Sequence, residues 1–261
     1  MMEQSTRGPR AAIITGSSSG LGASLANVLS ARGWSLMCWA DDAKDSVEPI
    51  REGAWRIVRR RDLSDPDGEA EMVADFVTRT GRLDALVNNA AVQLLGTVEE
   101  LSHEDWNKSV AVNLSAPFRL SKHAVPHMRI SGGGVILNVT SVHANATGAR
   151  RTAYAATKAG LLGLTRAMAV DHGPDNIRAI AISPGPFATA KLNEGVANLY
   201  PDLDQDSALR AYAARLPSRR VGRPEEFATF AALLLEDDAT FLNGTEITID
   251  GGLSARLAVG E

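Results

Sequence analysis

Tyr154 and Lys158 are the pair whose types and spacing most directly suggest chemistry. They stand four positions apart in a segment, 152–171, whose alanine, leucine and methionine spacing predicts a helix. On a helix that spacing places both side chains on one face, about 5–6 Å apart at Cβ. Because a lysine ammonium beside a phenol favours the phenolate, we expect a lowered pKa for Tyr154 and a usable general acid or base near neutral pH. Taken alone, the pair could also be an accidental spacing on a solvated helix face.

A glycine-rich loop near the start of the chain predicts a site for a pyrophosphate. Residues 10–15 form a short apolar run, which is followed by Gly16, three serines, Gly20 and Gly22 and then by a helical pattern over 20–31. Glycines permit a tight turn and a close backbone approach, and a helix N-terminus offers free N–H groups. The spacing is G-x-x-x-G-x-G rather than G-x-G-x-x-G, and glycine clusters also occur in ordinary loops.

Strands and helices alternate along the whole chain. Apolar runs predict strands at 10–15, 34–40, 54–58, 83–87, 135–140, 177–183 and 245–249. Helical patterns lie at 20–31, 66–80, 102–112, 114–130, 152–171 and 223–235. Continuous apolar strands favour a parallel sheet covered on both faces, so we predict a single doubly wound Rossmann-type α/β domain with about seven strands.

The ends of the chain and one internal segment depart from this alternation. We predict a flexible N-terminal leader over residues 1–9 and place the domain at residues 10–261. Residues 187–221 lose clean periodicity, which predicts one or two short helices in a mobile substrate segment.

Polar residues follow several predicted strands. Asp62, Asn88, Ser141 and Pro184 each follow one. In parallel sheets ligands bind beyond the carboxyl ends of the strands, so these residues are expected to converge on one crevice. The amides of Asn88 and its neighbour are suited either to backbone groups or to an adenine ring.

Composition excludes several other classes of function. The 261 residues carry a net charge of −4 without a basic block, so we expect neither a nucleic-acid partner nor a membrane partner. No apolar stretch approaches the roughly 20 residues that span a bilayer, and the first nine residues lack a signal-peptide core. The single cysteine, Cys38, fits a cytoplasmic protein. His123 and His127 lack a third ligand, so we expect no metal site.

Taken together and in this order, the motifs resemble those of the short-chain dehydrogenase/reductase family over nearly the whole chain. The residues that carry the resemblance are the glycine loop at 15–22, Asp62, Asn88-Asn89-Ala90, Asn113, Ser141 thirteen residues before Tyr154, Lys158, Pro184-Gly185 and Thr189. Ala91 departs from the family's usual glycine, and Asp41 stands one residue later than the usual acidic residue of NAD-dependent members.

The resemblance implies a catalytic set. Tyr154 would exchange a proton with the substrate oxygen, and Ser141 would donate a hydrogen bond to that oxygen. Lys158 would lower the Tyr154 pKa and contact the nicotinamide ribose, while Asn113 would hold a water that links Lys158 to solvent. A plain turn for Asp62 and a plain cap for Asn113 remain open as alternatives.

The resemblance also implies a cofactor site and a substrate mouth. Asp62 and the asparagine pair would border the adenine, and Thr189 the carboxamide. The cofactor-binding residues would be Gly16, Ser18, Ser19, Gly20, Leu21, Gly22, Asp41, Asp62, Leu63, Asn89, Ala90, Tyr154, Lys158, Pro184, Gly185, Phe187 and Thr189. Gln93, His143 and Asn145 are the candidate substrate residues, with Arg150 and Arg151 close to the same mouth.

The sequence thus predicts an NAD(P)-dependent oxidoreductase that interconverts a secondary alcohol and a ketone, with a small-molecule substrate that is sugar-like or polyol-like. A dehydratase or epimerase on the same fold, and a non-catalytic dinucleotide sensor, are the alternatives. NAD is expected over NADP because Asp41 ends the second strand and would repel a 2′-phosphate. The apolar circumference of helices 114–130 and 152–171 predicts a homotetramer, with a dimer as the second choice.

Overall fold

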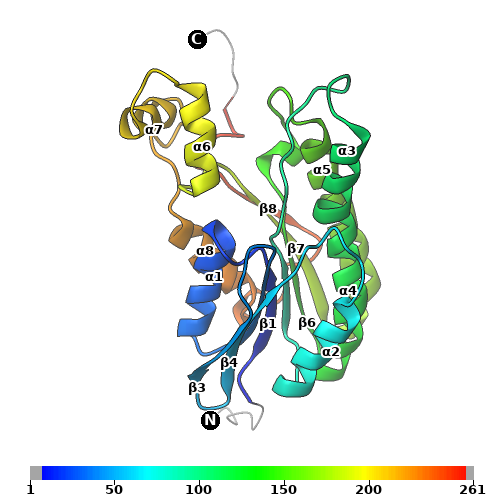
Figure 1. Ribbon diagram of the computed structural model, residues 1–261. Helices are drawn as coiled ribbons and strands as arrows, with labels where there is room; N and C mark the ends of the chain where they lie inside the picture. The colour runs from blue at the N-terminus through cyan, green and yellow to red at the C-terminus, as the bar shows by residue number, and fades with distance from the viewer. Residues whose placement is uncertain (1–7, 257–261) are drawn as a thin grey trace.

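One eight-stranded sheet organises the molecule, whose computed structural model describes residues 8–256 (Figure 1). The strand order is β3-β4-β2-β1-β5-β6-β7-β8, and every neighbouring pair is parallel except β3 and β4. The strands are β1 (Ala11–Thr15), β2 (Ser35–Ala40), β3 (Ser46–Arg51), β4 (Ala54–Arg60), β5 (Ala85–Asn88), β6 (Gly134–Val139), β7 (Ile177–Pro184) and β8 (Glu246–Ile249). The single α/β domain is confirmed, while most of the predicted leader, residues 1–7, lies outside the described residues.

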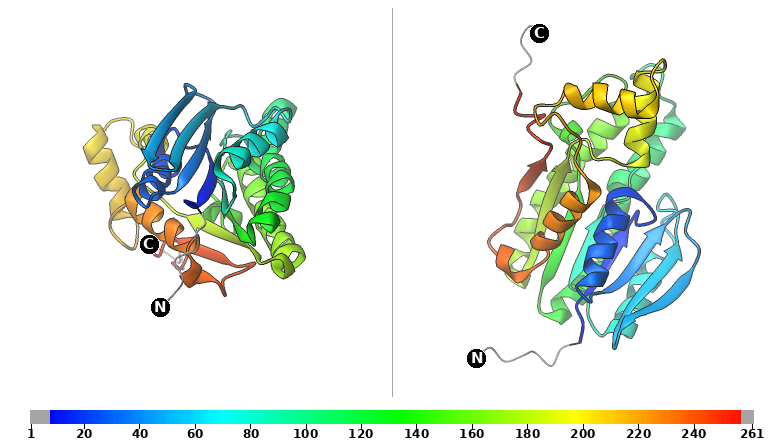
Figure 2. Two further views of the ribbon diagram at one scale, coloured as in Figure 1. Left: turned by 90° about the horizontal axis from the view of Figure 1, so that it is seen from below. Right: turned by 90° about the vertical axis from the view of Figure 1, so that its left-hand side faces the viewer.

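Helices cover both faces of the sheet. The helices are α1 (Gly20–Ala31), α2 (Glu69–Thr80), α3 (His103–Val110), α4 (Ala116–Ser131), α5 (Thr152–His172), α6 (Ala190–Leu199), α7 (Gln205–Ala214) and α8 (Pro224–Leu234). One apolar core lies under α1 and α8 and the other under α2, α4 and α5 (Figures 1 and 2). In residues 8–256, no helix is long and apolar enough to cross a membrane.

The position of β1 explains where a site can form. All five of its residues are buried, because both faces of the strand are covered by helices. β1 pairs with β2 on one side and with β5 on the other. The strands that follow β1 in the chain are first added on the β2 side of the sheet, and from β5 onward they are added on the opposite side. Such a switch point opens a crevice at the carboxyl ends of the strands.

Two elements differ from the sequence prediction. The predicted sheet lacked β3, which pairs antiparallel with β4 and contains Pro49, a residue that the edge of a sheet tolerates. The predicted break between two helices near 113 is instead a π-helical turn, Ala111–Ser115, that joins α3 to α4. A π turn inside a helix frequently marks a functional position.

Residues 187–221 contain two helices, α6 and α7, as predicted. Figures 1 and 2 show this pair beyond the end of the sheet, next to α1 and α8. Thr189 is the N-cap of α6, and its hydroxyl accepts a hydrogen bond from the Leu192 N–H at 3.3 Å. The segment returns to the body of the protein at a short bridge between Phe187 and Gly222.

Candidate active site

Tyr154 and Lys158 lie in the first turns of α5, beside the carboxyl end of β6. Both are helical, as the spacing predicted, and the Lys158 ammonium is 5.7 Å from the centroid of the Tyr154 ring. Lys158 is buried and donates a 2.6 Å hydrogen bond to the Val139 carbonyl. Ser141 lies two residues after the end of β6, where its hydroxyl accepts a hydrogen bond from the His143 N–H at 3.2 Å and is near enough to Tyr154 to affect the pKa of that phenol. The structure therefore brings together three of the four predicted catalytic residues.

The predicted direction of the Tyr154 pKa is wrong. Burial raises the pKa of Tyr154, and the hydrogen bond with Ser141 and the charge of Arg151 oppose that rise without reversing it. Burial, together with the smaller effect of the nearby charge of Lys191, lowers the pKa of Lys158 to about 7. Helical spacing alone shows neither the desolvation of the phenol nor the hydrogen bond that holds the ammonium at Val139.

Asn113, the fourth predicted catalytic residue, sits in the π turn between α3 and α4. Its buried side chain accepts a hydrogen bond from the Val92 N–H and donates to the Val92 carbonyl, both at 2.9 Å. Its amide also donates to the Thr157 hydroxyl at 3.1 Å, next to Lys158 in the chain. Asn113 thus ties the segment after β5 to α5, and both amide hydrogens are used in doing so.

The candidate substrate residues have different surroundings. The His143 ring packs edge to face on Tyr154, with ring centroids 6.0 Å apart. Burial and the charge of Arg151 lower the pKa of His143 to about 4, so the imidazole is neutral at neutral pH. The Asn145 amide instead donates to both carboxylate oxygens of Glu246, at 2.7 and 2.9 Å. Gln93 is half-buried in the segment after β5.

The glycine loop is braced from the neighbouring strand. Gly16 has a positive φ of 64°, and a Cβ there would come within 2.7 Å of the Ala90 backbone. The Asn89 amide donates to the Thr15 and Gly16 carbonyls at 3.0 and 2.8 Å. Of the two alternatives for the asparagine pair, the structure therefore shows backbone bonding for Asn89. Asn88 donates into the core, to Asn138.

The start of α1 fits an anionic group. Its N-cap, Ser19, makes no side-chain capping bond, and no acidic residue occupies the first turn. Free N–H groups at a helix start bind phosphate. A Cβ on Gly20 would stand 3.3 Å from the Thr189 side chain, so the two loops approach closely. With Ser18 exposed and Leu21 and Gly22 opening the helix, the predicted cofactor loop has the form that a pyrophosphate requires.

The adenosine side of the predicted site contains an arginine that the sequence analysis did not identify. Arg60, at the end of β4, donates from Nε to the Asp41 carbonyl at 2.9 Å. Register explains this contact, since Arg60 pairs with Ala40 of β2. Asp41 itself is exposed in the turn after β2.

Asp62 forms a turn, which was the alternative to a cofactor contact. Its carboxylate accepts hydrogen bonds from the Ser64 N–H and hydroxyl at 2.9 and 2.7 Å, and these bonds lower the Asp62 pKa. Leu63 is held by Arg119, which donates to the Leu63 carbonyl and forms a two-bond ion pair with buried Glu69. The loop is therefore fixed from α2 and α4.

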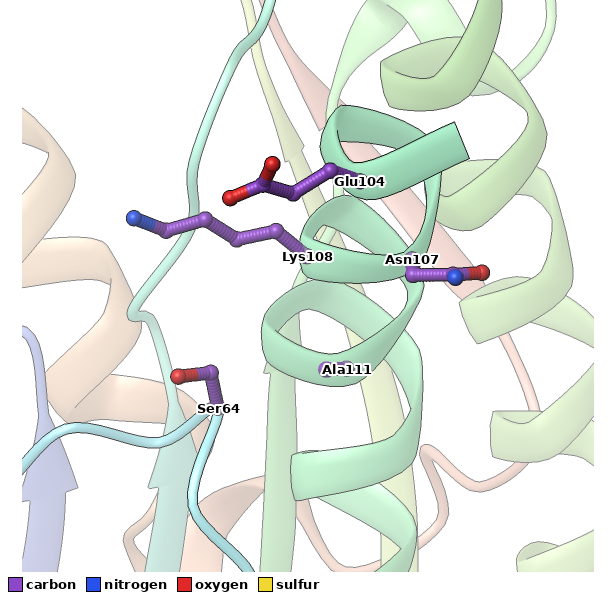
Figure 3. Close-up of a pocket in the computed structure, with 5 residues that line it drawn as sticks. All are labelled: Ser64, Glu104, Asn107, Lys108 and Ala111. Carbon is purple, nitrogen blue, oxygen red and sulfur yellow. The ribbon is translucent and has the colours of Figure 1, made fainter. Parts of the chain in front are cut away.

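A pocket borders this loop and α3. Figure 3 shows Glu104 and Lys108 projecting from α3 on the side of Ser64, with Asn107 pointing away. Ala111 completes the lining. None of these residues belongs to the predicted catalytic set, so the pocket is separate from the site of proton transfer.

The segment after β7 packs against the last strand. The Gly185 N–H donates to the Ile249 carbonyl, and a Cβ on Gly185 would lie 2.6 Å from the Asp250 Cβ. Phe187 is buried in edge-to-face contact with Phe227 of α8. Pro184, Gly185, Phe187 and Thr189 thus form one wall opposite the glycine loop. Among the described residues no cluster of His, Cys, Asp or Glu could hold a metal ion.

Two cations near Tyr154 were not assigned by the sequence analysis. The Lys191 ammonium lies 6.0 Å from the centroid of the Tyr154 ring, reaching over it from the first turn of α6. The charge of Arg151, at the N-cap of α5, adds to the effect of burial in lowering the pKa values of His143 and Lys191, and it opposes the rise of the Tyr154 pKa. Arg151 was placed only near the mouth, and Lys191 lies in the segment without periodicity.

This chain is similar to a family model, to characterised and uncharacterised protein sequences, and to solved structures. A family model described as enoyl-(acyl carrier protein) reductase matches residues 16–254. An uncharacterized oxidoreductase of Thermotoga maritima is 37% identical, over 93% of this chain and 96% of its own, and the cis-4-hydroxycyclohexanecarboxylate dehydrogenase of Sinomonas cyclohexanicum is 34% identical, over 94% and 97%. The solved aldohexose dehydrogenase of Thermoplasma acidophilum superposes with a TM-score of 0.88 at 26% identity and 97% coverage of both chains.

Proposed function

Because this chain belongs to the short-chain dehydrogenase/reductase family, we propose that it interconverts a secondary alcohol and a ketone in an NAD(P)-dependent reaction. The observation that carries the proposal is the meeting of Ser141, Tyr154 and Lys158 at the carboxyl edge of the sheet. The two named relatives act on a hydroxycyclohexane acid and on aldohexoses, which are both alcohol substrates.

The residues have separate parts in this reaction. When bound, the nicotinamide cofactor accepts or supplies the hydride. Tyr154 exchanges a proton between its phenol oxygen and the substrate oxygen, and Ser141 donates a hydrogen bond where negative charge develops. Lys158 places its amino group beside the phenol and would contact the cofactor ribose. Asn113 anchors this arrangement through Val92 and Thr157 and holds a water at its backbone.

Protonation of Tyr154 sets the expected pH dependence. Because burial raises its pKa, the phenol keeps its proton at neutral pH and is ready to protonate a ketone oxygen during reduction. Alcohol oxidation instead requires the phenolate. The oxidation rate should therefore rise with pH above neutrality, while the reduction rate should stay level until the pH approaches the raised pKa of Tyr154.

For the cofactor we propose NAD in preference to NADP. The support is Asp41 at the end of β2, where a carboxylate accepts hydrogen bonds from a ribose 2′-hydroxyl and repels a 2′-phosphate. Arg60 is the opposing influence, but its Nε is engaged by the Asp41 carbonyl.

We also propose that this protein is a homotetramer whose α6–α7 segment closes over the substrate. Phe118 and Ile130 on α4 and Val170 on α5 are 55%, 85% and 77% exposed, which is unusual for large apolar side chains on helices of a single chain. Burial between subunits would remove them from water. Closure of α6 and α7 would exclude water during hydride transfer.

The experiment that tests the function is a spectrophotometric panel of alcohols and ketones with NAD and NADP, comparing wild-type protein with Tyr154→Phe. Turnover of at least one pair is expected, and the variant should lose about 10²–10⁴-fold in kcat while binding the reduced cofactor normally. A variant that kept more than about a tenth of wild-type kcat, with chemistry rate-limiting, would refute the assignment of Tyr154. No redox turnover at all would favour a dehydratase, an epimerase or a sensor.

A further inference from the structure

Positive charge gathers around Tyr154, and the Glu194 carboxylate compensates it only in part. Lys158 and Lys191 both place an ammonium within 6.0 Å of the phenol ring centroid, and Arg151 acts on the same ring through its charge. In the part of the chain from 8 to 256, neither Arg151 nor Lys191 makes an ion pair or a side-chain hydrogen bond with protein groups. This concentration occurs in a protein whose net charge is −4.

The neighbouring residue Arg150 has an acidic partner, whereas Arg151 has none among the described residues. Arg150 forms an ion pair with Glu100 at 2.6 Å, so its charge is compensated. The backbone on both sides is fixed, because the Gly96 N–H donates to the Arg150 carbonyl and Thr152 donates to the Gly96 carbonyl. Arg151 therefore stands at a defined place with an uncompensated charge.

Lys191 occupies an electrostatically unfavourable position. It lies in the first turn of α6, where the helix dipole disfavours a positive charge, and no acidic residue shares that turn. Lys191 is an exposed residue, but partial desolvation of its ammonium and the charge of Arg151 lower its pKa, and Glu194 opposes them only in part. A cation in this position stabilises neither the helix nor the lysine itself, but an anion bound beside it would relieve both effects.

We propose that Arg151 and Lys191 form an anion-binding subsite over Tyr154 and that the substrates of this enzyme are hydroxy acids and their keto acids. This inference rests on the proposed function. With the carbinol oxygen at Tyr154, the carboxylate lies a few carbon atoms away, between the α5 N-cap and the start of α6. A planar guanidinium pairs with both oxygens of a carboxylate, and a flexible ammonium adds a second charge-assisted bond.

The reaction itself is unchanged by this assignment. The C–H bond of the carbinol breaks, its hydride leaves with the cofactor, and the hydroxyl proton passes to the phenolate oxygen of Tyr154. The carboxylate takes no part in the transfer. Its attraction to α6 would favour the closed position of the α6–α7 segment, so binding of an acid and closure are coupled.

The test compares hydroxy acids with their uncharged carboxamides. 2-Hydroxybutyrate, 3-hydroxybutyrate and cis-4-hydroxycyclohexanecarboxylate, each beside its amide, are assayed with wild type, Arg151→Gln, Lys191→Gln and the control Arg150→Gln, which removes the same charge one residue away. We expect wild type to prefer at least one acid over its amide by tenfold or more in kcat/KM. The two test variants should lose that preference because the acid rate falls much further than the amide rate, and the control should keep it.

The possible results separate the two proposals. Oxidation of neutral alcohols or amides without a preference for any acid would overturn the subsite and leave the oxidoreductase function standing. Equal losses for acid and amide, or a weaker affinity for NADH measured by its fluorescence, would show that the cations serve catalysis or the cofactor and would also overturn the subsite. Absence of oxidation across the whole panel, neutral alcohols included, would count against the proposed function itself.

Discussion

Replacing Lys158 by methionine tests the electrostatics of the site independently of any substrate. The side chain is fully enclosed, and burial lowers its pKa from 10.5 to about 7. Between these pH values the unfolded chain binds a proton at this lysine that the folded protein has largely released. Stability of the wild-type protein should therefore rise with pH through this window, and the full cost of the buried charge should be present below pH 7.

The structure sets the size of the effect. The difference between a pKa of 10.5 and one of about 7 corresponds to roughly 5 kcal/mol, at about 1.4 kcal/mol per pH unit. Methionine has a similar length and no charge. It loses the hydrogen bond to the Val139 carbonyl, which costs about 1 kcal/mol at every pH and so does not alter the slope.

Urea unfolding measures the difference in unfolding free energy between Lys158→Met and wild type. Both proteins are unfolded at equal subunit concentration, without cofactor, at intervals from pH 6 to pH 10. That difference should be constant near pH 6 and should then fall by about 1.4 kcal/mol per pH unit above pH 7. Lys122→Met, which removes an exposed lysine of α4, is the control for the loss of one charge. A difference that stays constant within about 0.5 kcal/mol across the range would refute the lowered pKa.

Three further predictions concern the cofactor, the mobile segment and the assembly. Asp41→Ala should raise the ratio of kcat/KM for NADP to that for NAD by about tenfold to a hundredfold, from loss of on the order of 1–3 kcal/mol of repulsion; an unchanged ratio would mean that Asp41 points away from the ribose. Hydrogen exchange should show weak protection over 187–221 without ligand, and protection equal to that of β6 would contradict the closing segment. Light scattering at micromolar concentration should return a tetramer mass, and a monomer mass would exclude the proposed assembly.

Local pattern was sufficient for most of the fold and for the placement of Tyr154 and Lys158 on one helix. Apolar runs identified seven of the eight strands, and helical spacing placed Tyr154 and Lys158 on one face of α5. These features depend on neighbours in the chain, which the sequence contains directly. The strand that was missed, β3, has charges and Pro49 within it and is a strand only because β4 offers an open edge.

Long-range contacts decided what those residues experience. The Tyr154 pKa rises because the phenol is buried, and the Lys158 ammonium turns to the Val139 carbonyl from another element. Arg60 reaches Asp41 through the register of β4 on β2. The burial of a side chain and the partner that a charged group contacts depend on which segments pack together, and segments distant in the sequence can do so.

The sequence by itself therefore determined the class of the protein and the order of all its strands except β3, and it supplied the candidates for proton transfer. Only the tertiary structure decided the protonation of those residues and the placement of Lys191 over Tyr154. Lys191 is 37 residues from Tyr154 in a segment without periodicity, so no spacing along the chain connects them. Their proximity follows from the position of α6 against the start of α5, and electrostatic forces act through that distance in space.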